Sequence, residues 1–373
     1  MRLVFWFSAA MVLYAYLGYP VWLWVRSRWK ARQVWRSAFT PSVSIVMVVR
    51  DEEANLPVKL QNLTALDYPR DRLEILVVSD GSTDGTDDIL REWAERGAIQ
   101  PIFATRHSGK AEGLNQAIPE AQGEIVLFTD VRQVIEPGAV RLLVENFADA
   151  DVGCVSGELM LGDPHGGESS SGMGLYWRVE KKVRELESLS GSTIGATGAL
   201  YAARKILLVQ LPADLILDDV FLPMSVIRQG FRVVFDPRAR AWDKADLGAG
   251  REFWRKVRTL SGNYQLVEAA PWLMSRENPS RWDFVSHKLL RLLVPFALAG
   301  LLLSAAGLGG PFYLTCLFAQ LGFYTLSLLA AVPARLGVVG RVADAALTFV
   351  LLNTAALVAF RNFALGRKTA WSR

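Results

Sequence analysis

Acidic side chains stand at three points where an apolar run of the chain begins or ends. Asp130 follows the apolar run 125–128 by two residues, Asp80 closes a second run, and Asp218 and Asp219 open a third. A charge at the end of a buried strand is costly unless a ligand or a cation lies nearby. In open α/β sheets the ligand crevice lies outside the carboxyl ends of the strands. The acids therefore suggest a ligand site, although a solvated strand end, a plain turn or a helix cap would explain each one singly.

The adjacent acids Asp218 and Asp219 have two explanations that the sequence leaves open. One of them could cap the helix that starts here, which would contribute about 1 kcal/mol to its stability. Two neighbouring acids between apolar residues, in the segment ILDDVFL, instead suggest a general base or a metal site.

Several other kinds of site are excluded by missing residues. The loop that starts at Asp80 resembles a calcium-binding EF-hand loop, but its twelfth position is Arg91 instead of glutamate. Gly109-Lys110 lacks the Ser or Thr that follows the lysine of a phosphate-binding P-loop. No Gly-x-Gly-x-x-Gly follows a predicted strand, so a dinucleotide site of the Rossmann type is unsupported. The two cysteines and three scattered histidines show neither disulfide nor zinc-site spacing.

The elements that position these acids alternate between strands and helices. Runs of β-branched and apolar residues predict strands, and apolar residues at helical spacing predict helices between them. The predicted strands cover residues 42–49, 73–78, 99–103, 125–128 and 152–161. Such alternation is typical of an α/β fold with a parallel sheet that has helices on both faces. Asp80 and Asp130 should then lie on one edge of the sheet, within a single domain that spans residues 40–250.

The two ends of the chain are too apolar for an ordinary soluble protein. Of the 373 residues 51% are hydrophobic, and the mean hydropathy is +0.21. About 20 apolar helical residues span the hydrocarbon core of a bilayer. Stretches of about this length lie at residues 3–25, 289–308, 312–332 and 342–360. We therefore expect a transmembrane anchor with a basic flank over residues 1–39, and about three more transmembrane helices within residues 289–373.

Basic residues follow the first apolar stretch and predict its orientation. They are Arg26, Arg28, Lys30, Arg32 and Arg36. By the positive-inside rule they place the central domain in the cytoplasm. The net charge of +4 suggests the lipid bilayer surface as a partner, and no nucleic-acid-binding signature is present. Residues 251–267 mix basic with aromatic residues, which predicts a helix in the membrane interface beside the acceptor site, within an interfacial segment 251–288.

Four segments together resemble the family-2 glycosyltransferases, in particular the membrane-integrated branch of cellulose, hyaluronan and poly-N-acetylglucosamine synthases. They are VSIVMVVRDEEANL, VVSDGSTDGT, GKAEGLNQAI followed by GEIVLFTD, and LDDVFLPMSVIRQGFRV. The order and spacing of these segments are highly specific, and the flanking apolar stretches agree with that branch. The resemblance runs from about residue 43 to the end of the central domain. It implies a GT-A fold, a nucleotide-sugar donor and inversion at the anomeric carbon.

The resemblance also implies roles for individual residues. Asp80 would contact the uridine of a UDP-sugar, with Glu52 and Lys110 nearby in the nucleotide pocket. Asp130 matches the first acid of the family's D-x-D motif, near the diphosphate and a divalent metal such as Mg²⁺ or Mn²⁺. Asp219 matches the general base that ends the T/S-E-D motif, and Asp218 replaces the glutamate beside that base. A base is needed because a sugar hydroxyl is a poor nucleophile until a carboxylate accepts its proton.

Two positions depart from the family pattern. Arg132 stands where D-x-D has its second acid, so one usual metal ligand is missing, although a guanidinium can itself neutralise diphosphate oxygens. Arg255 and Arg258 keep both basic ends of the Q/R-x-x-R-W motif and would serve the diphosphate. Thr259 replaces the tryptophan that would stack on the acceptor sugar. A weakly held metal and one or a few sugar additions, instead of a long polymer, are therefore expected.

These features predict a membrane-embedded inverting glycosyltransferase. It would move a sugar from a nucleotide-sugar, expected to be a UDP-sugar, to a lipid-linked or growing saccharide acceptor at the cytoplasmic membrane face, in glycolipid or exopolysaccharide synthesis. A processive polysaccharide synthase and a catalytically decayed membrane scaffold are the alternatives. A sugar nucleotidyltransferase would share the strand-end acids, but the segment VVRDEEANL lacks the Gly-rich phosphate loop of that class.

Overall fold

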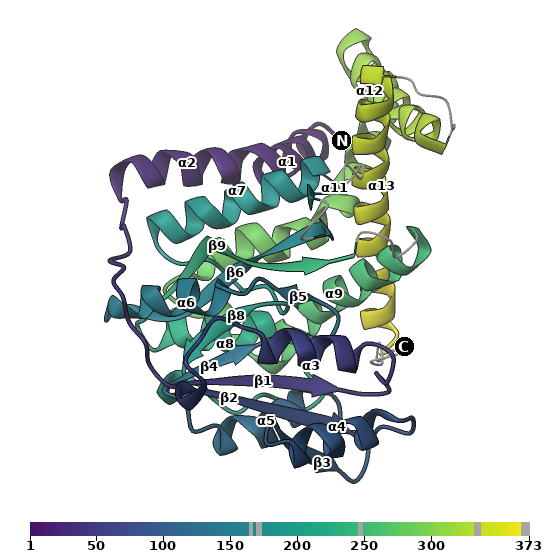
Figure 1. Cartoon of the computed structure of the whole chain (residues 1–373). Helices are drawn as coiled ribbons and strands as arrows, with labels where there is room; N and C mark the ends of the chain where they lie inside the picture. The colour runs from purple at the N-terminus through teal and green to yellow at the C-terminus, as the bar shows by residue number, and fades with distance from the viewer. Residues whose placement is uncertain (164–166, 169–173, 245–248, 332–336, 367–373) are drawn as a thin grey trace.

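In the computed structural model a central sheet is covered by helices on both faces (Figure 1). The structure describes residues 1–163, 167–168, 174–244, 249–331 and 337–366. Within them the sheet has nine strands in the order β3-β2-β1-β4-β8-β6-β9-β5, with β7 paired to β6. The strands are β1 (Val43–Val49), β2 (Leu73–Asp80), β3 (Gln100–Ala104), β4 (Ile125–Phe128), β5 (Val134–Ile135), β6 (Val152–Asp163), β7 (Gly167–Glu168), β8 (Tyr201–Arg204) and β9 (Arg232–Asp243). All five predicted strands are confirmed, as β1, β2, β3, β4 and β6.

The helices cover the sheet or extend from it. Those of the central region are α3 (Leu56–Thr64), α4 (Thr86–Glu95), α5 (Lys110–Glu120), α6 (Ala139–Val144), α7 (Gly174–Ser190), α8 (Asp218–Arg228) and α9 (Ala249–Ala269). Those nearer the chain ends are α1 (Arg2–Leu13), α2 (Tyr19–Trp29), α10 (Arg281–Phe284), α11 (Leu290–Leu308), α12 (Pro311–Leu328) and α13 (Gly337–Ala364). Helix α9 is the helix predicted within segment 251–288.

The sheet is mixed, so the prediction of a parallel sheet holds for only part of it. β1 runs parallel to β2 and β4, and β2 runs parallel to β3. β8 runs antiparallel between β4 and β6, with Tyr201 opposite Phe128. Segment 191–200 ends at the edge of the sheet where β4 ends. β8 starts at that edge and therefore runs antiparallel to β4.

Both faces of the central strands are buried, which explains their unbroken apolar runs. On β1, Ile45 and Met47 belong to the core under α3 and α6, whereas Val46 and Val48 belong to the core under α5 and α8. Successive side chains of a strand point to opposite faces, so a strand that is covered on both sides needs apolar residues at every position. The sheet is thereby fixed between two cores, and its carboxyl edge is held in place.

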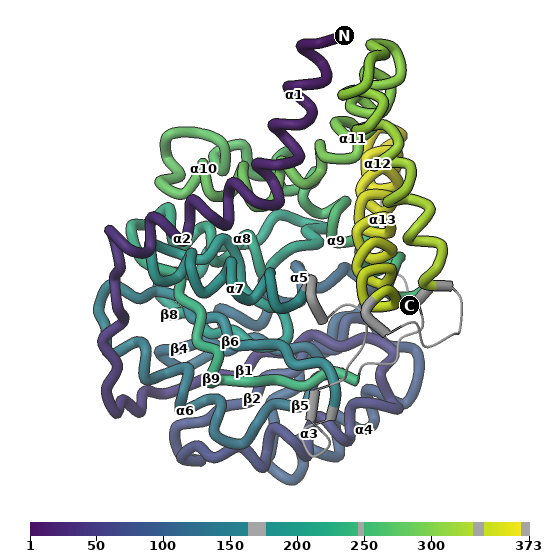
Figure 2. The backbone as a smooth tube through the Cα atoms, turned by 90° about the horizontal axis from the view of Figure 1, so that it is seen from above, coloured from purple at the N-terminus to yellow at the C-terminus, as the bar shows by residue number. Residues whose placement is uncertain are grey.

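The N-terminal helices pack along α7 and α11 (Figures 1 and 2). A π-helical turn, Tyr14–Gly18, joins α1 to α2. Tyr19 and Leu23 of α2 are buried against Val183 and Leu186 of α7. α1 lies against α11 at a close approach, where a side chain added at Gly300 would meet Ser8 Oγ at 2.8 Å.

Three helices in the described part of the chain are long and apolar enough to cross a membrane. They are Arg2–Trp29, Arg281–Leu308 and Val339–Ala364. The predicted stretch 312–332 forms the apolar helix α12, which is not one of these three, and its last residue lies outside the described residues. One candidate span is N-terminal and two are C-terminal, and α12 is the additional apolar helix of the three that the sequence predicts at the C-terminal end.

Candidate active site

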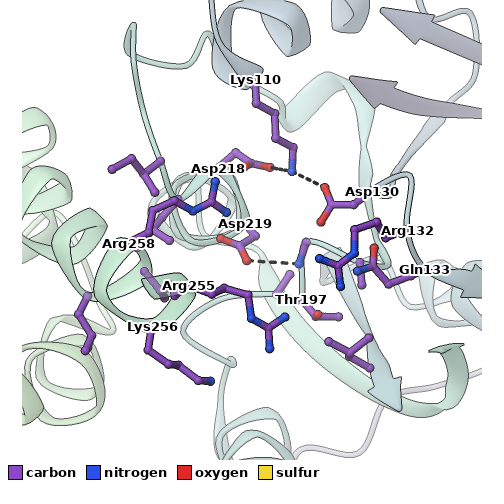
Figure 3. Close-up of a pocket in the computed structure, with 18 of the residues that line it drawn as sticks. Lys110, Asp130, Arg132, Gln133, Thr197, Asp218, Asp219, Arg255, Lys256 and Arg258 are labelled. Atoms are coloured by element: carbon purple, nitrogen blue, oxygen red, sulfur yellow. Dashed lines mark hydrogen bonds and ion pairs between the residues drawn. The ribbon is translucent and has the colours of Figure 1, made fainter. Parts of the chain in front are cut away.

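The carboxyl ends of β1 and β4 face helices α5, α8 and α9 across a cavity of about 430 Å³ (Figure 3). The cavity-lining residues include nine Lys or Arg and five Asp or Glu, so a bound anion is favoured. Eight of the nine predicted site residues line it: Glu52, Lys110, Asp130, Arg132, Asp218, Asp219, Arg255 and Arg258.

Lys110 lies between two carboxylates at the first turn of α5. Its Nζ donates to Asp130 Oδ1 at 2.9 Å and lies 3.2 Å from Asp218 Oδ2. Burial alone would lower the pKa of Lys110, but the two carboxylates outweigh this effect and hold that pKa above its ordinary value. Lys110 is therefore a permanent positive charge beside Asp130.

Asp219 is a carboxylate whose pKa is shifted toward neutral pH. It is the second residue of α8, and its Oδ2 accepts a hydrogen bond from the Gly198 N–H at 3.2 Å. Burial and the neighbouring charge of Asp218 raise the pKa of Asp219 to about 6, against the lowering effect of Lys110. A carboxylate with such a pKa is ionised at pH 7 and is well matched to accepting a proton there.

Small residues let segment 194–201 pack closely against α8. The Ala196 N–H donates to the backbone carbonyl of Asp219 at 2.7 Å. At Gly198 an added Cβ would lie 3.5 Å from a carboxylate oxygen of both Asp130 and Asp219. The close approach that the small residues suggest is thus to helix α8, and it places the Gly198 backbone beside the two acids.

Asp243, the last residue of β9, was not predicted from the sequence. Its side chain is almost fully buried and accepts hydrogen bonds from Arg132 Nη2 at 3.0 and 3.1 Å and from Gln133 Nε2 at 3.0 Å. Arg255 Nη1 lies 4.0 Å from the same carboxylate. Asp243 thus holds the two predicted basic residues at one wall of the cavity. Its place at the end of an apolar strand, like that of Asp130, was the signal that could have identified it.

Glu52 and Arg258 also line the cavity. The backbone N–H of Glu52 donates to Thr86 Oγ1 at 2.8 Å, and its carboxylate accepts a hydrogen bond from Asn55 Nδ2 at 2.7 Å. Arg258 follows Arg255 by three residues on α9, is half-buried, and forms no ion pair with any residue that the structure describes. Its guanidinium is therefore available to an anion in the cavity.

Asp80 is not among the residues that line this cavity, and its contact with a nucleotide stays a prediction. Its side chain is fully buried, and its oxygens accept hydrogen bonds from the Ser108 N–H at 2.7 Å and the Gly109 N–H at 2.9 Å. His107 Nδ1 lies 2.7 Å away. Burial alone would raise the pKa of Asp80, but these hydrogen bonds lower it. Asp80 therefore fixes the loop that leads into Lys110.

Asp130 is the acid at the D-x-D position, and its side chain is 42% exposed. One of its oxygens accepts the bond from Lys110, and Arg132 is paired with Asp243 instead of with Asp130. Within the described residues no group of three or more His, Cys, Asp or Glu side chains could hold a metal ion. Asp130 could supply one carboxylate ligand, and Mg²⁺ is commonly held by one or two carboxylates together with substrate phosphates.

The cavity extends to helices α7 and α11, which the sequence did not connect with the site. Glu180 of α7 is buried there, 3.0 Å from His287 Nε2 and 2.8 Å from Arg291 Nη1. Burial would raise the pKa of Glu180, but His287 and Arg291 hold it well below its ordinary value. His287 Nδ1 lies 2.7 Å from Glu187 Oε1, so both ring nitrogens face a carboxylate. Basic residues at the start of an apolar stretch, including Lys288, were the available signal.

Comparisons with known sequences agree with this geometry. The family model described as Glycosyl transferase family 2 matches residues 44–208. Poly-beta-1,6-N-acetyl-D-glucosamine synthases of Staphylococcus aureus (strain COL) and Staphylococcus epidermidis are each 23% identical, over 60% and 62% of this chain. The matches cover 55% and 56% of those proteins, so the chain spans about half the length of these curated relatives.

The fold is shared with a solved structure over nearly the whole chain. A mannosyltransferase from Pyrobaculum calidifontis, solved in complex with GDP-Man and Mn²⁺, has a TM-score of 0.72 and 24% identity. The match covers 98% of this chain and 99% of that one, and it shows the fold alone. The family model, the fold and the cavity at the carboxyl edge of the sheet agree with the resemblance found in the sequence. Residues 44–208 therefore match the model of glycosyl transferase family 2, in a chain with a GT-A-like fold.

Proposed function

We propose that this protein is an inverting glycosyltransferase that uses a nucleotide-sugar donor. Asp219 carries the proposal, because its pKa of about 6 suits a general base and it lies in a cavity with an excess of basic side chains. A nucleoside diphosphate sugar is an anion that this excess attracts. An acceptor hydroxyl needs a carboxylate that takes its proton.

The reaction follows from the placement of these groups. Asp219 accepts the proton of the acceptor hydroxyl while the hydroxyl oxygen bonds to the anomeric carbon, on the face opposite the diphosphate. The bond from that carbon to the diphosphate oxygen breaks, and its electron pair leaves with the diphosphate. The configuration is inverted because the entering and leaving oxygens lie on opposite faces. Arg132, Arg255 and Arg258 are the groups that stabilise the charge on the departing diphosphate.

Asp130 is the residue that would hold a divalent cation, Mg²⁺ or Mn²⁺, together with the donor diphosphate. The cation would add positive charge beside the departing diphosphate. The Mn²⁺ in the mannosyltransferase of the same fold supports this assignment. Lys110 and Arg132 supply positive charge from the protein itself, so we expect metal binding to be weak.

The relatives and the cavity suggest two kinds of donor. The staphylococcal proteins are named for poly-N-acetylglucosamine synthesis, which favours a UDP-sugar, and the mannosyltransferase was solved with GDP-Man. The basic residues in the last turn of α2 and directly after it support placing the catalytic region at the cytoplasmic face. On the same basis we propose four units, residues 1–39, 40–250, 251–288 and 289–373, as anchor, transferase domain, interfacial segment and C-terminal membrane region.

A lipid-linked or saccharide acceptor is proposed, with one or a few additions to each. Thr259 is exposed and its Oγ1 donates to the Arg255 carbonyl at 3.0 Å, so no stacking ring is present at this position. One observation favours a processive synthase as the second candidate. Trp177 of α7 lines the cavity and could stack on a sugar, although Lys256 Nζ lies over its ring at 5.1 Å.

The proposal is tested by the release of nucleoside diphosphate. The purified full chain in lipid nanodiscs receives UDP-N-acetylglucosamine, UDP-glucose or GDP-mannose, with membrane extract as the source of acceptor. We expect release from one of these donors, and a loss of roughly 10²–10⁴-fold in Asp219→Asn. Asp71→Asn, at an exposed position away from the cavity, is the matched control. Absence of release from every donor would instead support a decayed scaffold.

Product length in the same assay separates the two candidates. Acceptors that are each extended by one or a few sugars support single transfer. Polymers far longer than the acceptor, formed while most acceptor molecules are unmodified, support a processive synthase.

A further inference from the structure

We propose that the end of the cavity between α7 and α11 binds the phosphate of a lipid-linked acceptor, with Lys288 as its central contact. The inference rests on the proposed transferase function and specifies the chemical class of its acceptor. Three observations carry it: the charge of this end of the cavity, the position of Lys288, and the apolar helix surface beyond it.

Basic side chains gather at this end of the cavity. Four basic residues from four elements line it: Arg184, Lys256, Lys288 and Arg291. Glu180 faces Arg291 at 2.8 Å and Arg184 at 3.7 Å, and Glu252 lies 3.5 Å from Lys256. Over the whole cavity nine basic side chains outnumber five acidic ones, and a phosphate group would balance this excess through charge-assisted hydrogen bonds.

Lys288 is the member of this group that the protein itself does not satisfy. It forms no hydrogen bond or ion pair with a residue that the structure describes, yet it lies within electrostatic range of Glu180, Arg184, Asp219 and Glu187. It belongs to the π-helical turn Val285–Leu289, and such turns occur frequently at functional sites. A phosphate on Lys288 would therefore lie near the proposed base, so that a sugar attached to it can reach Asp219.

The helix beyond Lys288 offers an apolar surface for the lipid chain. α11 belongs to the candidate span Arg281–Leu308, and Leu293 and Phe296 on it are 45% and 40% exposed. They follow Lys288 by five and eight residues, about 8 and 12 Å along a helix at 1.5 Å per residue. A phosphate joined to an apolar chain matches this order of charged and apolar contacts. Inorganic phosphate matches only the first part.

Binding of farnesyl phosphate to the full chain in detergent, measured by calorimetry, tests the inference. We expect farnesyl phosphate to bind at least about tenfold more tightly than farnesol or inorganic phosphate, because it makes both sets of contacts. Lys288→Met keeps the apolar stem and removes the charge, and should weaken this binding about tenfold. Lys182→Met, at an exposed position on α7 paired with Glu185, is the matched control and should bind as the wild type does.

The remaining measurements keep the outcome unambiguous. Binding of UDP or GDP to Lys288→Met at wild-type strength shows that the cavity is intact. Equal binding of farnesyl phosphate by wild type and Lys288→Met would overturn the inference. Binding of dihexanoyl phosphatidic acid as tight as that of farnesyl phosphate would also overturn it, because the site would then belong to a bilayer phospholipid. Because binding needs no turnover, an inactive protein with Lys288-dependent binding contradicts only the proposed function. An active protein without such binding contradicts only this inference.

Discussion

The ionisation of Asp219 should determine how transfer falls at acidic pH. With a pKa of about 6, the carboxylate is about 90% ionised at pH 7 and about 10% ionised at pH 5. If the ionised form accepts the proton of the acceptor, kcat/KM should fall about tenfold between these two pH values. Asp219→Asn should remove this limb of the profile together with most of the activity.

A change at Asp218 should move the acidic limb in a known direction. Its negative charge helps to raise the pKa of Asp219, and Asp218→Asn removes that charge while keeping the shape of the side chain. Two unit charges about 4 Å apart interact by about 4 kcal/mol at an effective dielectric constant of about 20. About 1.4 kcal/mol corresponds to a tenfold change in ionisation. Lys110, which lowers the pKa of Asp219, also loses one of its two carboxylate partners, so this change acts in the same direction. The acidic limb should therefore move by at least about one pH unit, from about pH 6 to about pH 5 or lower.

The assay is the initial rate of nucleoside diphosphate release from roughly pH 5 to pH 8, compared among wild type, Asp218→Asn and Asp71→Asn. Thermal unfolding at each pH confirms that the proteins stay folded. Since Asp218→Asn can also lower the absolute rate, the profiles are compared after scaling to their values at neutral pH. A wild-type profile that is flat in the acidic range, or an Asp218→Asn profile that overlays it, would refute the role of Asp219 as base.

Three further predictions concern residues around the cavity. Arg132→Ala should weaken binding of nucleoside diphosphate about tenfold or more, since hydrogen bonds to charged groups contribute about 1.5–3 kcal/mol; tighter binding in calorimetry would contradict this. Asp80→Asn keeps the side-chain shape but weakens the hydrogen bonds from the backbone N–H groups of loop 107–109. These N–H groups should therefore exchange faster with deuterated water. Unchanged exchange would exclude a role of Asp80 in positioning the loop. His287→Asn leaves two buried carboxylates with fewer partners, which should cost about 3–5 kcal/mol and lower the Tm. An unchanged Tm would show that this histidine does not bridge the buried charges.

The amino-acid sequence by itself determined the first half of the sheet and most of the site. Strands such as β1 and β4 are buried on both faces and therefore appear as unbroken apolar runs. Because these strands run parallel, polar residues that follow them come together at one edge. This is why Asp130 could be placed at that edge without coordinates, whereas Lys110 and Asp219 at the start of α8 were added from the family pattern.

Only the tertiary structure decided which partners these residues have. Asp80 also lies at the carboxyl end of a parallel strand, yet its carboxylate accepts hydrogen bonds from the loop at residues 107–109. Arg132 is bound to Asp243, which lies 111 residues further along the chain. His287 reaches Glu180 across 107 residues and so joins a candidate membrane span to the catalytic cavity. A hydrogen bond depends on how distant segments approach each other in space, and local composition does not encode that approach.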